Sequence, residues 1–106
     1  MSWHIVSRPE AETDIAEAAE WYEKEQTGLG IEVVAEVQQT YATISQNPFL
    51  NARKHPRLSV RWRLTRRFPY RVIYQIFELQ QIVVVVSVIH SARHDRRWQK
   101  RLIQSP

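Results

Sequence analysis

The stretch that decides the fold is Ile82–His90, with the sequence IVVVVSVIH. Its four consecutive valines are β-branched, which disfavours a helix, and the run is far too short to cross a bilayer. Such a run predicts a strand buried on both faces, and strands of this kind lie in the interior of a sheet. It ends abruptly in His90-Ser91-Ala92-Arg93-His94, so basic and imidazole side chains directly follow the most apolar strand.

The composition predicts one globular domain over residues 1–106. Hydrophobic residues make up 43% of the chain, which has only two glycines and five prolines, so a disordered chain is excluded. The absence of cysteine excludes a disulfide scaffold, a thiolate metal site and a cysteine nucleophile. We find no signal peptide after Met1 and no segment of transmembrane length, so we expect a soluble cytoplasmic protein.

Charge is divided unevenly along the chain. Residues 1–50 contain two basic and nine acidic residues, whereas residues 51–106 contain thirteen basic and two acidic ones. This asymmetry predicts a basic face that suits an anionic partner. The alternative is that acidic helices neutralise a basic sheet within the same small domain.

Two amphipathic helices are predicted in the acidic half. Ser7 and Glu10 fit a capping box, and small or apolar residues then recur at helical spacing over residues 8–26. Gly28-Leu29-Gly30 ends this helix, and the second helix is predicted from Ile31 to Ser45. Because so few residues join them, the two helices should form an antiparallel hairpin.

The remaining pattern predicts four strands. They are expected at Trp3–Val6, Val60–Thr65, Tyr70–Phe77 and Ile82–Ile89, with a loop over 46–59 and a short helix within Asp95–Ile103. Period-two alternation from Val60 predicts that Val60, Trp62 and Leu64 face the core while Arg61 and Arg63 face solvent.

The order strand–helix–helix–strand–strand–strand predicts an α+β fold with two layers. A mainly antiparallel sheet should carry the helix hairpin on one face. Because a helix hairpin returns the chain to the end where it began, we expect the first strand to run antiparallel to the second. The last strand should lie between the first and the third, where both of its edges are covered.

Several motifs in this order resemble the RelE/ParE superfamily, the toxins of type II toxin–antitoxin systems, and in particular its ParE-like, plasmid-stabilisation members. The resemblance covers nearly the whole chain. The motifs are Ala18-Ala19-Glu20-Trp21-Tyr22, Gly28-Leu29-Gly30, Asn47-Pro48, Arg66-Arg67-Phe68-Pro69-Tyr70-Arg71-Val72-Ile73-Tyr74, and Val88-Ile89-His90 followed by Arg93 and Trp98.

The resemblance implies a growth-inhibiting protein that a cognate antitoxin holds inactive. ParE-like members inhibit DNA gyrase, whereas RelE-like members cleave mRNA on the ribosome. A basic surface also suits an acidic, partly disordered antitoxin segment that folds on it. A third alternative is a basic nucleic-acid-binding domain without toxicity.

His90 and Arg93 are the candidate catalytic residues if the protein is a nuclease. Cleavage through a 2′-hydroxyl needs an acid, a base and a cation near the phosphate, and the pKa of histidine lies near working pH. Arg93 and Arg61 would then hold the phosphate through their planar guanidinium groups. The alternative is that His90, at a strand end, is a structural hydrogen-bond partner.

Further basic residues are candidates for contact with the target or with phosphate. Alternation along strands is also typical of an ordinary solvated face, so this alternative remains open. The candidates are Lys54, Arg61, Arg63, Arg66, Arg67 and Arg71, with His55 on the neighbouring segment.

The C-terminal region lacks a residue that RelE-like nucleases usually carry there. No tyrosine follows Tyr74, and Trp98 cannot transfer a proton, which favours a ParE-like binder. Trp62 and Trp98 can stack bases, but their spacing favours core packing. His90 and His94 lack an evident third ligand, so we predict no metal site and no cofactor.

Overall fold

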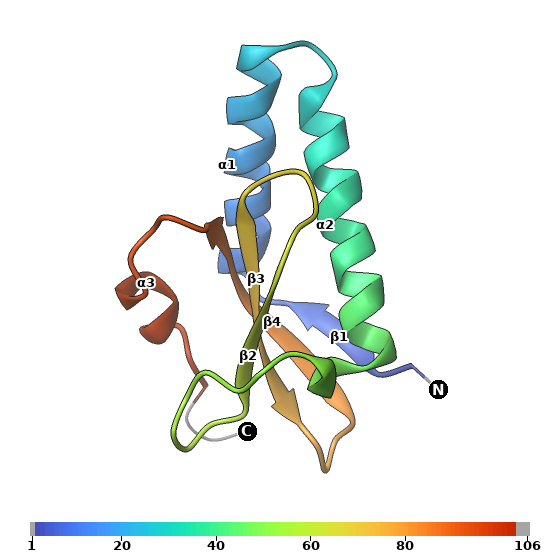
Figure 1. The fold of residues 1–106 in the computed structure, drawn as a ribbon, viewed down its shortest axis with the longest axis vertical. Helices are drawn as coiled ribbons and strands as arrows, with labels where there is room; N and C mark the ends of the chain where they lie inside the picture. Colours follow the sequence, from blue (N-terminus) through green and yellow to red (C-terminus); the bar gives the residue numbers. More distant parts are fainter. Residues whose placement is uncertain (1, 104–106) are drawn as a thin grey trace.

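The computed structural model describes residues 2–103 and shows a helix hairpin standing against a four-stranded sheet (Figure 1). This is the α+β fold predicted from the sequence. The elements are β1 (His4–Ser7), α1 (Pro9–Glu25), α2 (Leu29–Gln46), the 3-10 turn η1 (Pro48–Leu50), β2 (Val60–Leu64), β3 (Tyr70–Phe77), β4 (Ile82–His90) and α3 (Arg96–Gln99).

The strand order is β1-β4-β3-β2, so β4 lies between the first and third strands, as predicted. β3 runs antiparallel to both β2 and β4, whereas β1 pairs with β4 in parallel. β1 and β2 therefore run in the same direction. The prediction that the first strand is antiparallel to the second was wrong.

The position at which α2 ends explains this direction. The Trp3 amide donates to the Ser45 carbonyl at 2.7 Å, and the Ser45 hydroxyl donates to the Trp3 carbonyl at 2.5 Å. The returning helix α2 thus runs along the whole length of β1, and its last turn reaches Trp3, the residue before β1 begins. The segment 47–59 then leads into β2 from that same end of the sheet.

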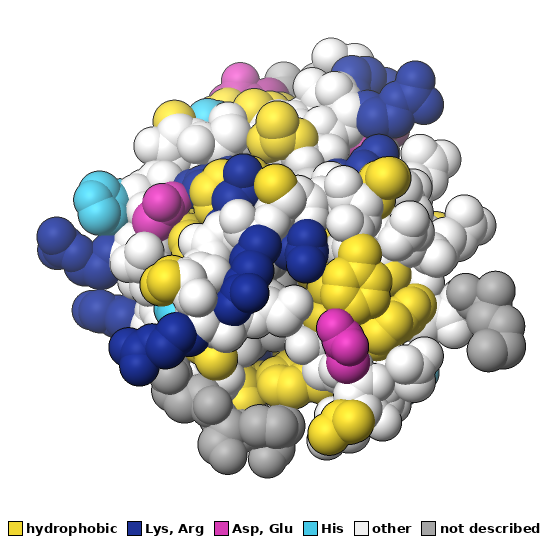
Figure 2. Space-filling view, turned by 60° about the horizontal axis from the view of Figure 1, so that its bottom comes forward, with side chains coloured by type: hydrophobic (Ala, Val, Ile, Leu, Met, Phe, Trp, Pro, Cys, Tyr) yellow, Lys and Arg dark blue, Asp and Glu magenta, His cyan; other side chains and the backbone are white. Residues whose placement is uncertain are grey.

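The two charge blocks of the sequence lie on different parts of the fold. Figure 2 views the end remote from the tip of the helix hairpin, and it shows more Lys and Arg than Asp and Glu side chains. Ion pairs join the blocks at a few points, including Arg67 with Glu32 at 2.7 Å and Arg101 with Asp14 at 2.6 Å. The acidic helices therefore neutralise part of the basic half.

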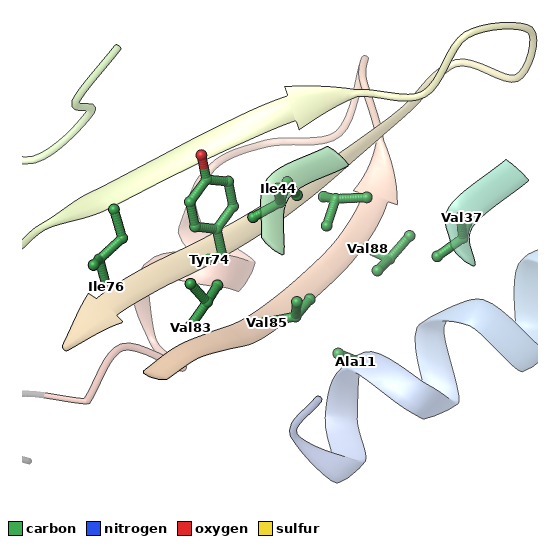
Figure 3. Packing of buried hydrophobic residues seen from close by; sticks show 9 residues of the cluster. Ala11, Val37, Ile44, Tyr74, Ile76, Val83, Val85 and Val88 are labelled. Carbon is green, nitrogen blue, oxygen red and sulfur yellow. The ribbon is translucent and has the colours of Figure 1, made fainter. Parts of the chain in front are cut away.

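The main core lies between the helix hairpin and the sheet (Figure 3). Ala11 of α1 and Val37 and Ile44 of α2 pack there against β3 and β4. A β-bulge between Ile73 and Tyr74 of β3 and their partners in β4 shifts the pairing register. The side chains that β4 adds to this core are Val83, Val85 and Val88.

The opposite face of the sheet has a second core around α3. Trp98 is 2% exposed and packs with Val60, Ile73, Val86 and Ile89. This cover explains why β4 is apolar on both faces, because the helix hairpin protects one face and Trp98 the other. The predicted helix within Asp95–Ile103 is confirmed, although it extends only over Arg96–Gln99.

Local geometry differs from the predicted capping of α1. Arg8 is the N-cap residue and no side chain caps this helix, because Ser7 belongs to β1. The Ser7 hydroxyl instead shares a 2.5 Å hydrogen bond with the hydroxyl of Tyr41 in α2. Burial raises the pKa of Tyr41 to about 12, so its phenol stays protonated and can keep this bond.

In β2, the predicted alternation fails at its last residue. Leu64 is 57% exposed, while Arg61 and Arg63 are half-buried. The strand lies at the edge of the sheet, so little covers its end. Within the described part of the chain, residues 2–103, no helix is both long and apolar enough to span a membrane.

A close backbone approach fixes the helix hairpin at Gly30. A Cβ atom at this position would lie 2.8 Å from the Ala19 carbonyl oxygen. The carboxylate of Glu23 accepts hydrogen bonds from the amides of Gly28 and Gly30, and these bonds lower its pKa. Gly28 has φ +96°, a backbone conformation that favours glycine.

Gly30→Ala should therefore lower the free energy of unfolding by about 1 kcal/mol. Overpacking typically costs about 1–3 kcal/mol, and the cost should lie toward the upper end here because the clash is with a backbone atom. The ~1 kcal/mol by which alanine favours a helix over glycine offsets only part of that cost. Urea denaturation measures the difference. Ile31→Ala at the neighbouring exposed position is the control and should change stability by less than about 0.5 kcal/mol. An unchanged or higher stability of Gly30→Ala would contradict the close approach.

Candidate functional site

The end of β4 places His90 against β3. His90 pairs with Tyr70 across the sheet, and their ring centroids lie 5.7 Å apart at an interplanar angle of 75°. The Nδ1 atom of His90 accepts a hydrogen bond from the Ala92 amide at 3.1 Å. Neutral His90 in this arrangement carries its proton on Nε2, which is therefore a donor and not a base.

A cavity of about 390 Å³ opens beside His90, between α1 and the end of β4. It combines carboxylates from α1, aromatic rings and cationic groups from the segment after β4. Its principal polar and aromatic lining residues are Asp14, Glu17, Trp21, Tyr22, Tyr70, His90, Arg93 and Arg97. We call this cavity the β4-end pocket. It brings the two candidate catalytic residues, His90 and Arg93, to one place.

Tyr70 is the group in the β4-end pocket whose pKa is shifted. Partial burial raises the pKa of Tyr70, the nearby Tyr22 raises it further, and Arg93 opposes the shift. Its phenol is therefore protonated at neutral pH. Tyr70 can donate a hydrogen bond, or a proton to a strongly basic leaving group, but it is not a base.

Asp14 anchors the pocket to the uncovered edge of β4. β1 pairs with β4 only as far as Val85. Beyond this point the Asp14 carboxylate accepts from the Val88 amide at 3.0 Å and from Arg101 at 2.6 and 3.2 Å. Arg101 in turn donates to the Val86 carbonyl at 3.1 Å. Side chains thus replace a neighbouring strand at this edge.

Arg71 holds the segment that carries Arg93. Its buried guanidinium donates to Asp95 at 2.7 Å and to the Arg93 carbonyl at 2.8 Å, and it lies 4.7 Å from the ring centroid of Trp62. The hydrogen bond from Arg71 lowers the pKa of Asp95. Arg71 is only 6% exposed, so this sequence-predicted phosphate ligand is a structural residue that positions its neighbours.

Arg61 and Arg63 lie at a different place from His90. Arg61 donates to the Asn51 carbonyl at 2.5 Å and Arg63 to the Asn51 side chain at 3.3 Å. Arg61 pairs with Tyr74, which lies four residues along β3 from Tyr70, or roughly 13 Å at the rise of a strand. The predicted grouping of Arg61 with His90 and Arg93 is therefore absent from the described residues.

The other predicted cations lie on two further surfaces. Lys54 sits over the ring of Trp62, with 4.8 Å between its ammonium and the ring centroid. Arg67 pairs with Glu32 and stacks on Phe68 at the turn between β2 and β3. Arg66, at the same turn, is exposed. With Arg61, Arg63 and the buried Arg71, these residues make up the six candidates, which do not form one site.

The tryptophans and the second histidine have structural contacts. Trp98 is buried and packs edge-to-face on Trp62, with ring centroids 5.9 Å apart, which confirms core packing. The Nδ1 atom of His94 accepts from the Arg96 amide at 3.1 Å. His55 similarly accepts from the Leu58 amide at 2.9 Å. Among residues 2–103, no cluster of three or more metal-ligating side chains could hold an ion.

Sequence reasoning missed the contribution of α1 and α3 to the pocket. Asp14, Glu17 and Trp21 line one face of α1 at spacings of three and four residues, a pattern that could have been recognised. Trp21 is 56% exposed, which is unusual for so large an apolar ring. Arg97 gives no such signal, because only the fold brings it within 3.8 Å of Asp14.

A family model of ParE toxins of type II toxin–antitoxin systems, parDE, matches residues 5–95. A search of curated proteins finds no match. The solved structures that share the fold include the following three. One is the chromosomal ParDE system from P. aeruginosa, with a TM-score of 0.71, 12% identity and coverage of 84% of this chain and 96% of that chain.

The other two structures come from E. coli. A double mutant of the RelE toxin in the free state has a TM-score of 0.64 and 15% identity, covering 95% of this chain and 94% of that chain. The intact RelBE toxin–antitoxin complex has a TM-score of 0.63 and 16% identity, covering 87% of this chain and 100% of that chain. At such identities these likenesses show the shared fold alone.

Asp14→Asn should lower the free energy of unfolding by about 3 kcal/mol. The change leaves the largely buried Arg101 without its counter-charge, and breaking a buried ion pair typically costs about 3–5 kcal/mol. Glu12→Gln, which removes an exposed carboxylate from the same helix, is the matched control. In urea denaturation, the double variant Asp14→Asn/Arg101→Gln should lose less free energy of unfolding than the sum of the losses in the two single variants. Strictly additive losses would refute the coupling.

Proposed function

Because the chain belongs to the ParE toxin family of type II toxin–antitoxin systems, we propose that it arrests growth by binding DNA gyrase. The family match over residues 5–95 is the observation that carries this proposal. Gyrase acts on chromosomal DNA, so the proposal places the toxin in the cytoplasm. It assigns the contact to the β4-end pocket, where aromatic, cationic and hydrogen-bonding groups meet on an accessible surface.

The chemistry of the pocket supports binding over catalysis. Neutral His90 donates through Nε2, because its Nδ1 already accepts from Ala92. Tyr70 has a raised pKa and stays protonated. To act as a general base, His90 would have to give up the hydrogen bond from Ala92. The pocket is therefore better suited to hold an acceptor group of a partner than to remove a proton from a substrate.

The proposed partner that restrains the toxin is a cognate acidic antitoxin. The RelBE and ParDE structures that share this fold are toxin–antitoxin systems by name. In this chain, residues 51–106 carry thirteen basic and two acidic residues, which suits an acidic segment that folds on binding. Such a segment would mask the cations next to the pocket, and its proteolysis would release the toxin.

Ribosome-dependent mRNA cleavage is the second candidate function. The observation that favours it is the approach of Tyr70 to His90, with Arg93 in the same pocket. A protonated phenol can act as an acid, and an arginine can neutralise a phosphate. Tyr70 would then supply the phenol that the C-terminal region lacks, because no tyrosine follows Tyr74 in the sequence.

Purified toxin should inhibit DNA supercoiling by gyrase, and Arg93→Ala should weaken this inhibition by at least about tenfold. The variant removes a cation from the pocket while its backbone carbonyl still binds Arg71, so folding is retained. Removing one charge-assisted hydrogen bond, worth about 1.5–3 kcal/mol, corresponds to this factor. Arg57→Ala, an exposed cation outside the pocket, is the control. Normal supercoiling at excess toxin would rule the proposal out.

Sequencing of transcript ends during toxin expression tests the second function. Ribosome-dependent cleavage predicts new mRNA ends within translated codons, and both His90→Ala and Tyr70→Phe should abolish them. The second change removes the proton donor but keeps the ring that packs against His90. Intact transcripts during growth arrest would exclude cleavage. A nucleic-acid-binding domain without toxicity would neither arrest growth nor inhibit gyrase.

A further inference from the structure

Another cavity, of about 480 Å³, is formed by α3 and the residues that flank it. All of its lining side chains are cationic or imidazole groups: Arg93, His94, Arg96, Arg97, Lys100 and Arg101. We call it the α3 groove. In Figure 2, Lys and Arg side chains gather on the left, the side on which Figure 1 places α3. None of the cations proposed from the sequence at Lys54–Arg71 lines this groove.

The acidic groups next to the α3 groove are already engaged. Asp95 binds Arg71 at 2.7 Å, and Asp14 binds Arg101 at 2.6 Å from a largely buried position. Within residues 2–103, Arg93, Arg96 and Lys100 make no salt bridge, and all three are exposed. The groove thus keeps cations available for an external anion.

The fold holds these cations in place. Trp98 is buried in the second core and fixes α3 on the sheet, while Arg71 fixes the preceding segment through Asp95 and the Arg93 carbonyl. After α3, Gln75 exchanges two hydrogen bonds with the backbone of Ile103, at 2.8 and 2.9 Å. A groove held at both ends costs little conformational entropy when it binds a ligand.

We propose that the α3 groove binds the phosphodiester backbone of a nucleic acid. Guanidinium groups match phosphate geometry, and Lys100, the C-cap residue of α3, follows Arg96 by four residues, about one helical turn. Bound phosphates release counterions, which makes such contacts favourable without base recognition. The groove would therefore bind nucleic acid with little sequence preference.

An acidic peptide fits the α3 groove less well than phosphate does. A segment that folds on a surface needs apolar anchor points as well as charge. The lining of the groove includes no apolar residue. The inference does not rest on gyrase inhibition, because the groove is distinct from the β4-end pocket, although Arg93 and Arg97 lie between the two and line both.

Fluorescence anisotropy of the full chain with short labelled duplexes tests the proposal, with DNA and RNA in separate arms. The variant Arg96→Gln/Lys100→Gln removes two cations that line only the groove. In a plot of log affinity against log salt concentration, its slope should be less steep by about 2, one for each phosphate that is no longer neutralised. Preference for one duplex would identify the source of the phosphates.

The control variant Lys24→Gln/Arg57→Gln removes the same charge from two exposed positions outside the groove. Its salt dependence should equal that of the wild type. Equal slopes for the groove variant and the control, or tighter binding of a poly-glutamate peptide than of both duplexes, would overturn the proposal. Supercoiling assays on the groove variant separate the two inferences, because gyrase inhibition can be lost or retained independently of duplex binding.

Discussion

The contact between Asp14 and Arg101 is the constraint on which the rest of the structure depends. β4 is buried on both faces, yet β1 covers its outer edge only as far as Val85. Unpaired backbone groups beyond that point would be costly in an apolar environment. The carboxylate binds the Val88 amide and the guanidinium binds the Val86 carbonyl, so an ion pair completes the sheet where a strand is missing.

This contact also joins distant parts of the chain. Asp14 lies on α1, Arg101 lies after α3, and Arg8 donates to the Arg101 carbonyl at 3.0 Å. The start of the helix hairpin, the end of β4 and the C-terminal segment are thus tied at one point. Asp14 lines the β4-end pocket and Arg101 lines the α3 groove. This structural ion pair therefore connects the two cavities, and it helps to position Arg97, which lies 3.8 Å from Asp14.

Much of the fold could be predicted because it follows from periodicity. The apolar run at Ile82–His90 specified a central strand, and helical spacing specified the hairpin. The direction of β1 could not be predicted, because it depends on how far α2 extends past that strand. Leu64 was misplaced because alternation assumes a covered face, and the capping box failed because Ser7 instead bonds Tyr41.

The site was harder to predict because charge alone does not separate contact residues from structural ones. Arg71 and Arg93 look alike in the sequence, yet Arg71 is buried with two acceptors, whereas Arg93 projects into a pocket. Exposure follows from the fold. Arg71 on β3 lies over Trp62 of β2 and is covered by the segment before α3, whereas Arg93 lies beyond the end of β4 and is exposed. In this small domain, the buried arginines determine where the exposed ones stand, so loss of either kind would change the same cationic surface.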